Sequence, residues 1–426
     1  MRTSILKSFK DPVVFRRQLL AWAQQFREVA YLDSNSYPQQ YASFDAILAV
    51  DAFTSIRTDY HSSFEELSQY QQNSKDWLFG YLSYDLKNDV EELKSENFDC
   101  LGFPDLYFFQ PKKLFLIKDQ QVEILYLKFC DDEIESDFDE INECAIVNIP
   151  SAGIEIQQRI SKDIYVEKVT AMKQRIGSGD IYEANFCMEF FAENAFIDPA
   201  STFTKLNEIS TPPFAAFFKN HKHFVLSASP ERYLRKEGTR VISQPIKGTA
   251  RRSDNPELDE SIKAELCSNE KERSENIMIV DLVRNDLSKT AEKGSVNVEE
   301  LCGAYSFKQV HHLISTITSN SVQPPVEIIK NSFPMGSMTG APKISAMEII
   351  EELEETKRGV YSGAIGYFAP EGDFDFNVVI RSILYNSENN YLSFSVGSAI
   401  TSLSDPEKEY DECLLKAAAM RKVLTD

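Results

Sequence analysis

Two pairs of glutamates have a spacing that could gather carboxylates into one site. Glu272 and Glu275 are three residues apart, and Glu409 and Glu412 repeat this spacing near the end of the chain. Residues three apart in a helix share a face, and two such pairs could hold Mg²⁺, which takes oxygen ligands. Because the chain has 66 acidic residues, solvated surface is the simpler alternative. The apolar run 276–282 favours a site, since it places Glu275 at the mouth of a buried helix.

A lysine lies in a stretch that would hold its side chain rigidly. Lys247 follows a short strand-like run and stands between Pro245 and Gly248. Proline fixes φ, and glycine lets the backbone turn or approach a ligand closely. The alternative is a polar turn with a solvated lysine. A functional role for Lys247 therefore depends on which acidic and glycine-rich segments share its site.

Further candidates are an arginine, a histidine and two glycine-containing loops. An unpaired guanidinium in an apolar strand would be costly, so we expect Arg381 to have an anionic partner, either structural or a ligand. His312 could place an imidazole in the site or be an ordinary core histidine. The segment 336–343 precedes a predicted helix and could present N–H groups to an anion, or be a capped loop. Segment 396–399 could offer backbone amides to a carboxylate, or be a close-packed turn.

Hydrophobic periodicity predicts the elements that position these residues. Helices are expected over residues 1–30, Ser63–Gln72, Ser161–Ile176 with Ser161 as the N-cap, most of Glu257–Leu287, Lys343–Glu355 and Pro406–Val423. Strands are expected over segments that include 44–50, 77–85, 106–109, 114–117, 122–129, 181–193, 214–218, 224–228, 240–243, 361–368, 374–385 and 391–400. The acidic run 131–142 is interpreted as a solvated linker. Runs of strands without strict β-α alternation favour the α+β class, with antiparallel sheets covered by helices.

Composition narrows the class of protein. The 426 residues are 42% hydrophobic, enough for a large core, and the net charge of −21 argues against nucleic acid or an anionic membrane as partner. No apolar run approaches the length of a membrane span, and no signal peptide is evident. Seven scattered cysteines without a Cys-x-x-Cys pair favour reduced thiols and exclude a zinc motif. We therefore expect a cytoplasmic protein.

Taken together and in order, these motifs resemble the chorismate-utilising enzymes, which include component I of anthranilate synthase and of aminodeoxychorismate synthase. The resemblance covers about residues 160–420 and is weaker in the N-terminal third. The motifs that carry it are Ser229–Arg232, Pro245–Thr249, Glu275–Asp286, Val310–Leu313, Thr339–Lys343, Tyr361–Tyr367, Ile380–Arg381 and Glu409–Lys416. It implies a large single-domain antiparallel β-sandwich flanked by helices. Residues 1–150 would form its N-terminal region and residues 151–426 the chorismate-binding catalytic region.

The resemblance also implies a role for each matching residue. Glu275 and Glu412 fall at Mg²⁺-ligand positions, with Glu272 and Glu409 as water-mediated contacts. The implied catalytic residues are Lys247, Glu231 as general acid, and His312. The implied chorismate contacts are Gly248, Thr249, Tyr361, Arg381, Gly397, Ser398, Ala399 and Lys416. One departure is alanine at position 399, where the family has glycine. Its backbone N–H can still donate unless φ must be positive there.

Lys247 indicates the branch of the family. Anthranilate synthases typically have alanine at this position and aminodeoxychorismate synthases have lysine. The resemblance therefore implies aminodeoxychorismate synthase component I, which makes 4-amino-4-deoxychorismate for 4-aminobenzoate and folate. For this role Lys247 must be partly deprotonated, which desolvation or a nearby cation could achieve. No amidotransferase motif is apparent, so we expect ammonia from a separate glutaminase subunit. The alternatives are anthranilate synthase component I and a non-catalytic metabolite-binding relative.

Overall fold

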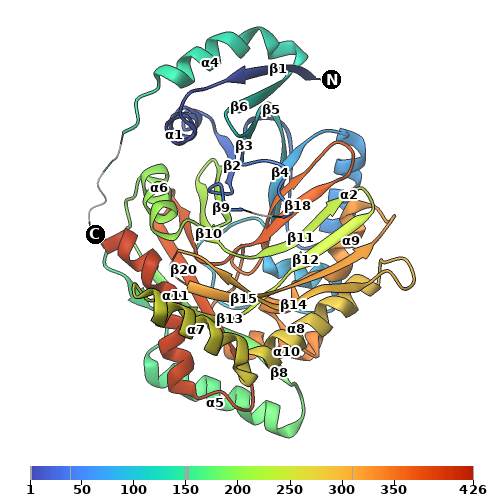
Figure 1. The fold of residues 1–426 in the computed structure, drawn as a ribbon, viewed down its shortest axis with the longest axis vertical. Helices are drawn as coiled ribbons and strands as arrows, with labels where there is room; N and C mark the ends of the chain where they lie inside the picture. Colours follow the sequence, from blue (N-terminus) through green and yellow to red (C-terminus); the bar gives the residue numbers. More distant parts are fainter. Residues whose placement is uncertain (1, 39, 148, 150–152, 309, 426) are drawn as a thin grey trace.

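Strands occupy the centre of the molecule and helices surround them (Figure 1). The computed structural model describes residues 2–38, 40–147, 149, 153–308 and 310–425. The strands are β1 (Arg2–Ser8), β2 (Glu28–Asp33), β3 (Ala46–Thr58), β4 (Leu78–Leu82), β5 (Leu106–Lys118), β6 (Gln121–Leu127), β7 (Gln157–Gln158), β8 (Glu183–Ala192), β9 (Phe214–Asn220), β10 (His223–Ser229), β11 (Arg232–Glu237), β12 (Arg240–Gln244), β13 (Ile246–Arg251), β14 (Asn297–Ser306), β15 (Val310–Asn320), β16 (Gly340–Ala341), β17 (Ala364–Phe368), β18 (Phe374–Val378), β19 (Ser382–Asn386) and β20 (Tyr391–Ile400). The helices are α1 (Pro12–Ala23), α2 (Ser63–Ser74), α3 (Lys87–Val90), α4 (Ile134–Glu143), α5 (Lys162–Ser178), α6 (Pro199–Ser210), α7 (Pro256–Ser268), α8 (Glu270–Ser288), α9 (Pro325–Ser332), α10 (Lys343–Leu353) and α11 (Pro406–Thr425).

Every pairing between these strands is antiparallel. Strands from the start of the chain join those from its end, because β2 pairs with β9 and β4 with β17. Along β9, Phe217 packs into one hydrophobic cluster and Phe218 into another. Successive side chains of a strand point to opposite faces, so the sheet is buried on both sides. The predicted α+β architecture, an antiparallel sandwich flanked by helices, is confirmed.

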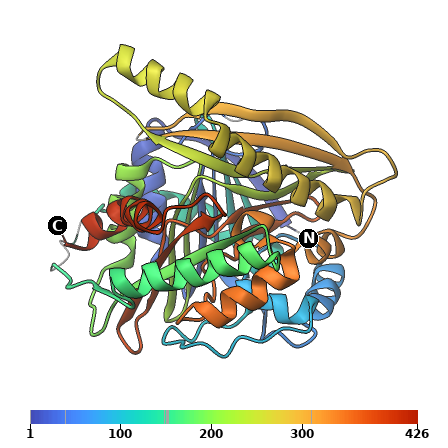
Figure 2. The same ribbon diagram turned by 90° about the horizontal axis from the view of Figure 1, so that it is seen from below.

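Two helices matter most for the site. Helix α8 packs against β13 and β15, and α11 packs against β20. Figure 2 shows α7 and α8 (yellow) along one side of the strands and α5 (green) and α10 (orange) along the other, with α11 (red) between them at the left. The side chain of Asn269 accepts a hydrogen bond from the Glu272 backbone N–H and begins α8 there. The acidic pairs therefore lie in the first turns of α8 and α11.

Two predictions in the N-terminal part were wrong. Residues 1–30 are not one helix: β1 pairs with β6, and α1 begins only after Asp11, which caps it. The acidic run 131–142 is not a linker, since most of it forms α4. Ile134 and Ile141 are buried at helical spacing on α4, so a sparse apolar stripe was enough to dock an acidic helix.

Other element boundaries also differ from the prediction. The two short strands expected within 106–117 are a single strand, β5. The strand expected over 374–385 is broken into β18 and β19, and Arg381 lies in the break with a left-handed φ of 51°. Most residues around the expected boundary at 150–151 lie outside the described part of the chain. Within the described part, no helix has the length and apolar character needed to cross a membrane.

Candidate active site

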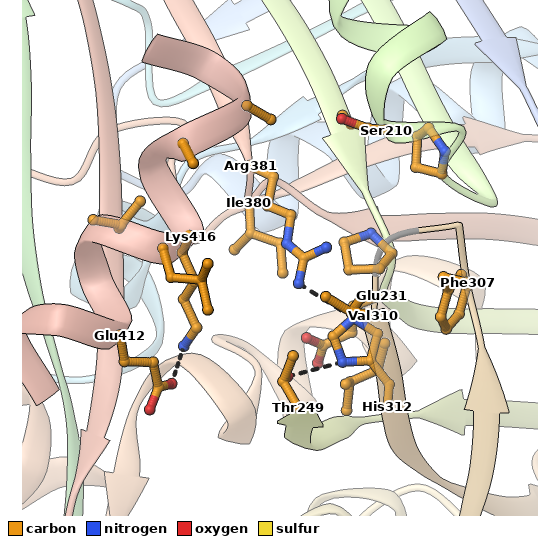
Figure 3. Close-up of a pocket in the computed structure, with 18 of the residues that line it drawn as sticks. Ser210, Glu231, Thr249, Phe307, Val310, His312, Ile380, Arg381, Glu412 and Lys416 are labelled. Carbon is orange, nitrogen blue, oxygen red and sulfur yellow. Dashed lines mark hydrogen bonds and ion pairs between the residues drawn. The ribbon is translucent and has the colours of Figure 1, made fainter. Parts of the chain in front are cut away.

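A cavity of about 670 Å³ collects the residues singled out from the sequence (Figure 3). Every predicted catalytic, substrate-contact and metal-ligand residue lines it except Ser398. Those that line it are Glu231, Lys247, Gly248, Thr249, Glu272, Glu275, His312, Tyr361, Arg381, Gly397, Ala399, Glu409, Glu412 and Lys416. Strands β13, β15 and β20 and helices α8 and α11 thus converge on one space.

Lys247 is buried and held in an ion pair. Its Nζ donates to Glu183 Oε1 at 3.0 Å, and its side chain is 11% exposed. Burial by itself would lower the pKa of Lys247, but the carboxylates of Glu183, Glu275 and Glu231 outweigh burial and raise the pKa above its usual value. The expectation that desolvation leaves this lysine partly deprotonated was therefore wrong for the protein without ligands. The sequence analysis considered the burial of Lys247 but not the carboxylate of Glu183, which raises the pKa of the lysine.

Glu231 has the properties of a general acid. It lies between β10 and β11 and is 4% exposed. Burial raises its pKa to about 7, although a hydrogen bond with Ser337 and the charges of Lys247 and Arg381 oppose the rise. A carboxyl with a pKa near 7 is partly protonated at neutral pH and can donate that proton to a leaving group.

Arg381 faces the cavity without a carboxylate partner among the described residues. Its Nη2 lies 3.2 Å from His312 Nε2, and His312 Nδ1 lies 2.9 Å from Thr249 Oγ1 (Figure 3). Burial lowers the pKa of Arg381 to about 10, with Glu231 opposing the change. Burial, followed by the charge of Arg381, lowers the pKa of His312 well below its usual value, so the imidazole is neutral. We expected the anionic partner of Arg381 to be either a carboxylate of the protein or a ligand. No such carboxylate is present among the described residues.

The four predicted metal-ligand carboxylates face the same part of the cavity. Lys271 Nζ lies 3.7 Å from Glu275 Oε1 and 3.3 Å from Glu409 Oε1, so an ammonium bridges α8 and α11. Burial raises the pKa of Glu275 to about 7, while Lys247 and Lys271 oppose the rise. Its Oε1 accepts no hydrogen bond within the described residues. Among the described residues, no group of three or more histidines, cysteines or carboxylates is arranged as a ready ligand set for a metal ion.

Lys416 links the second acidic pair to strand β20. Its Nζ donates to Glu412 Oε1 at 2.7 Å (Figure 3) and to the Gly397 carbonyl at 2.8 Å. Burial would raise the pKa of Glu412, but Lys416 outweighs it and lowers the pKa. Burial, aided by the charge of Glu412, raises the pKa of Glu272. The wall formed by α8 and α11 thus alternates carboxylates with lysines.

The segment 396–399 lies within β20 rather than in a turn. The side chain of Ser398 points away from the cavity, toward the Tyr165 hydroxyl at 3.2 Å. A Cβ at Gly397 would come within 2.6 Å of Cys187 Sγ, so a side chain does not fit there. Ala399 has no positive φ, and its methyl group is therefore compatible with the backbone. The departure from the family's glycine costs no backbone strain.

Gly248 and Tyr361 complete the wall around Lys247. Gly248 has a φ of 92°, and a Cβ there would lie 3.2 Å from Glu272 Oε2. Tyr361, just before β17, is 3% exposed, and its hydroxyl lies 3.7 Å from Cys187 Sγ. Sequence reasoning missed Glu183 and Lys271, and it gave Ser337 no role of its own within the candidate segment 336–343. An acid in the apolar run of β8 was the available signal for Glu183, because a buried carboxylate needs a partner.

Comparison with known proteins agrees with this geometry. A family model described as chorismate binding enzyme matches residues 27–422. A rice protein (Oryza sativa subsp. japonica) named probable aminodeoxychorismate synthase, chloroplastic, is 42% identical over 271 residues, which is 62% of this chain and 30% of that protein. An anthranilate synthase component I-like protein from Synechocystis sp. is 36% identical over 357 residues, which is 82% of this chain and 72% of that protein.

A solved structure shows the same fold. The crystal structure of anthranilate synthase component I from Streptococcus pneumoniae matches with a TM-score of 0.78 and 24% identity, over 90% of this chain and 94% of that one. This likeness supports the architecture alone. The chain spans less than a third of the rice relative's length, so that protein's name describes more than the matched segment. Because the family model covers most of the sequence, the chain belongs to the family of chorismate binding enzymes.

Proposed function

We propose that this protein is component I of an aminodeoxychorismate synthase, which converts chorismate and ammonia to 4-amino-4-deoxychorismate. The observation that carries the proposal is Lys247, whose amine lines the same cavity as Glu231. An amine and a proton-donating carboxyl are the two groups needed to replace a hydroxyl through a covalent intermediate. The rice relative's name supports this branch, whereas the Synechocystis relative's name points to the anthranilate branch. Lys247 is our reason for choosing the first.

The reaction begins with the amine of Lys247. As a neutral group it adds to C2 of the chorismate ring while the C4 hydroxyl departs. Glu231, with a pKa of about 7, gives its proton to that hydroxyl, which leaves as water. Ammonia then adds at C4 and expels the lysine from C2, and the enolpyruvyl group stays on the product. An enzyme without this lysine would add ammonia directly at C2, the first step toward anthranilate.

The cationic wall of the cavity accounts for substrate binding. Arg381 has no carboxylate partner among the described residues, so its guanidinium is available for the enolpyruvyl carboxylate, with Tyr361 beside it. The neutral imidazole of His312 holds the guanidinium in place without repelling it. Gly248, Thr249, Gly397, Ala399 and Lys416 line the rest of the cavity. Ser398 does not line the cavity, so we no longer assign its side chain a contact with the substrate.

The acidic wall supplies carboxylate oxygens, the ligand type that Mg²⁺ takes. Glu275 has a buried carboxylate oxygen without a hydrogen-bond partner among the described residues, and the Lys271 ammonium already lies between the two acidic pairs. We assign Glu275 and Glu412 as direct ligands, with Glu272 and Glu409 contacting the ion through water. When bound, Mg²⁺ supplies positive charge that holds the ring carboxylate of chorismate. The lysines and Arg381 position the remaining parts of the substrate.

The proposal also covers the source of ammonia, the cell compartment and the division of the chain into regions. We infer that ammonia comes from a separate glutaminase subunit and that the reaction runs in the cytoplasm, where the scattered cysteines stay reduced. We also assign residues 151–426 as the catalytic region and residues 1–150 as the N-terminal region. The cavity supports this assignment, since its lining residues begin at Asn185.

The test is to incubate the protein with chorismate, Mg²⁺ and ammonium and to identify the products by mass. We expect 4-amino-4-deoxychorismate from the native protein and none from Lys247→Ala, which should still bind chorismate. Lys236→Ala is the matched control, because Lys236 is also largely buried on a strand but does not line the cavity. Anthranilate, detected by its fluorescence without an added lyase, would support the other branch. Full turnover by Lys247→Ala would refute the covalent role.

A further inference from the structure

Glu183 stands directly behind the reactive lysine. It opens strand β8, is 1% exposed, and its Oε1 accepts a hydrogen bond from Lys247 Nζ at 3.0 Å. Its other oxygen, Oε2, is buried and has no hydrogen-bond partner among the described residues. A buried carboxylate oxygen without a partner costs stability, so its retention needs an explanation. None of the catalytic, substrate-binding or metal-binding roles proposed above is assigned to Glu183.

The position of Glu183 separates it from the substrate. It does not line the cavity, whereas Lys247 does. The backbone of Glu183 is fixed, because it pairs with Ala341 of β16 and the chain continues into the long β8–β20 ladder. Lys247 therefore lies between a rigidly held carboxylate and the space where substrate would bind.

We propose that Glu183 positions Lys247 and accepts the proton that its amine must lose before it adds to the substrate. This inference rests on the proposed function. Two other carboxylates act on Lys247 through their charge: Glu275 on α8, and Glu231 before β11. Glu231 is needed as the proton donor and Glu275 faces the other acidic residues. Glu183 is the carboxylate in contact with the nitrogen, and its free Oε2 can carry the proton.

The step balances without any further reagent. The ammonium of Lys247 passes one proton to Glu183, and the freed lone pair forms the N–C2 bond. The two ring double bonds shift, the C4–O bond breaks, and the departing hydroxyl takes the proton of Glu231 to leave as water. When ammonia later forms the C4–N bond, the double bonds shift back and the lysine leaves C2 as a neutral amine. Glu183 then returns its proton to the lysine, which restores the ion pair, and the new C4 ammonium passes one proton to Glu231, which restores the general acid.

The test compares Glu183→Gln with Glu189→Gln. Glu189 is a buried carboxylate on the same strand that pairs with Arg159 and lies outside the cavity, so it is a matched control. Lys247 reactivity is measured first, without chorismate, by reductive methylation with formaldehyde and cyanoborohydride and peptide mass spectrometry. Loss of the ion-pair partner should make methylation of Lys247 about tenfold faster in Glu183→Gln. The control should match the native rate.

The second measurement is steady-state turnover of the Glu183→Gln variant. With the proton acceptor removed, kcat should fall about 100-fold or more, while KM stays within about threefold because Glu183 does not line the cavity. Should Glu183→Gln fold poorly, Glu183→Asp keeps the charge and should give intermediate methylation and turnover. Unchanged methylation, or faster methylation with native kcat, would overturn the proposal. A native protein that makes anthranilate would refute the proposed function, yet the methylation result would still report on the ion pair.

Discussion

Replacing Glu231 with glutamine should remove turnover and at the same time stabilise the protein at pH 8. Burial gives this carboxyl a pKa of about 7 in the folded protein, against an ordinary value of 4.5. The folded state therefore holds the proton more tightly than the unfolded state. The contribution of this protonated carboxyl to the stability of the folded protein is fully present below pH 4.5. It is lost as the pH rises through about 7. Above pH 7, the buried carboxylate costs about 3 kcal/mol, because each pH unit between the two pKa values is worth about 1.4 kcal/mol.

Glutamine is neutral at every pH and avoids this cost. The free energy of unfolding of Glu231→Gln should exceed that of the native protein by about 3 kcal/mol at pH 8, and by less than about 1 kcal/mol at pH 5. Urea denaturation at both pH values measures the difference. Glu237→Gln is the control, since that carboxylate ends β11, the strand that follows Glu231, and its side chain is 66% exposed. Product formation should fall at least 100-fold in Glu231→Gln. Equal stability at both pH values, or a less stable variant at pH 8, would refute the account of Glu231.

Two further substitutions test the opposite walls of the cavity. Lys271→Met removes the ammonium between Glu275 and Glu409, so the protein without metal should lose stability and Mg²⁺ should bind several-fold more tightly. Isothermal titration and melting temperature with and without Mg²⁺ measure this, and weaker Mg²⁺ binding would count against the assigned ligands. Arg381→Gln should raise KM for chorismate at least tenfold with little loss of stability, because no carboxylate in the described chain depends on that guanidinium. An unchanged KM would show that the substrate carboxylate binds elsewhere.

Local spacing was enough to predict much of the site. Glu272 and Glu275 face the cavity together because a three-residue separation on a helix is a local property, and the same holds for Glu409 and Glu412. Hydrophobic periodicity likewise predicted α5 with its Ser161 cap. These features depend on residues a turn or two apart, which the sequence displays directly.

Features that depend on contacts between residues distant in the sequence could not be predicted in this way. The ion pair of Lys247 joins residues 64 positions apart, so its effect on the lysine's protonation could not be predicted. The left-handed backbone at Arg381 interrupts what reads as one apolar strand. Helix α4 was hidden by its acidic composition, because only the packing of Ile134 and Ile141 shows that one face is buried.

The pairing of β4 with β17 has a consequence for how this chain reaches its native state. Tyr81 is opposite Ile365, so the ribosome must make most of the sequence before this ladder can close. Until then β4, which pairs with β5 on one side, leaves its other hydrogen-bonding edge exposed. Contacts so distant along the chain form slowly and favour aggregation during synthesis. A fragment made only of residues 151–426, the proposed catalytic region, would keep the exposed edge of β17 permanently.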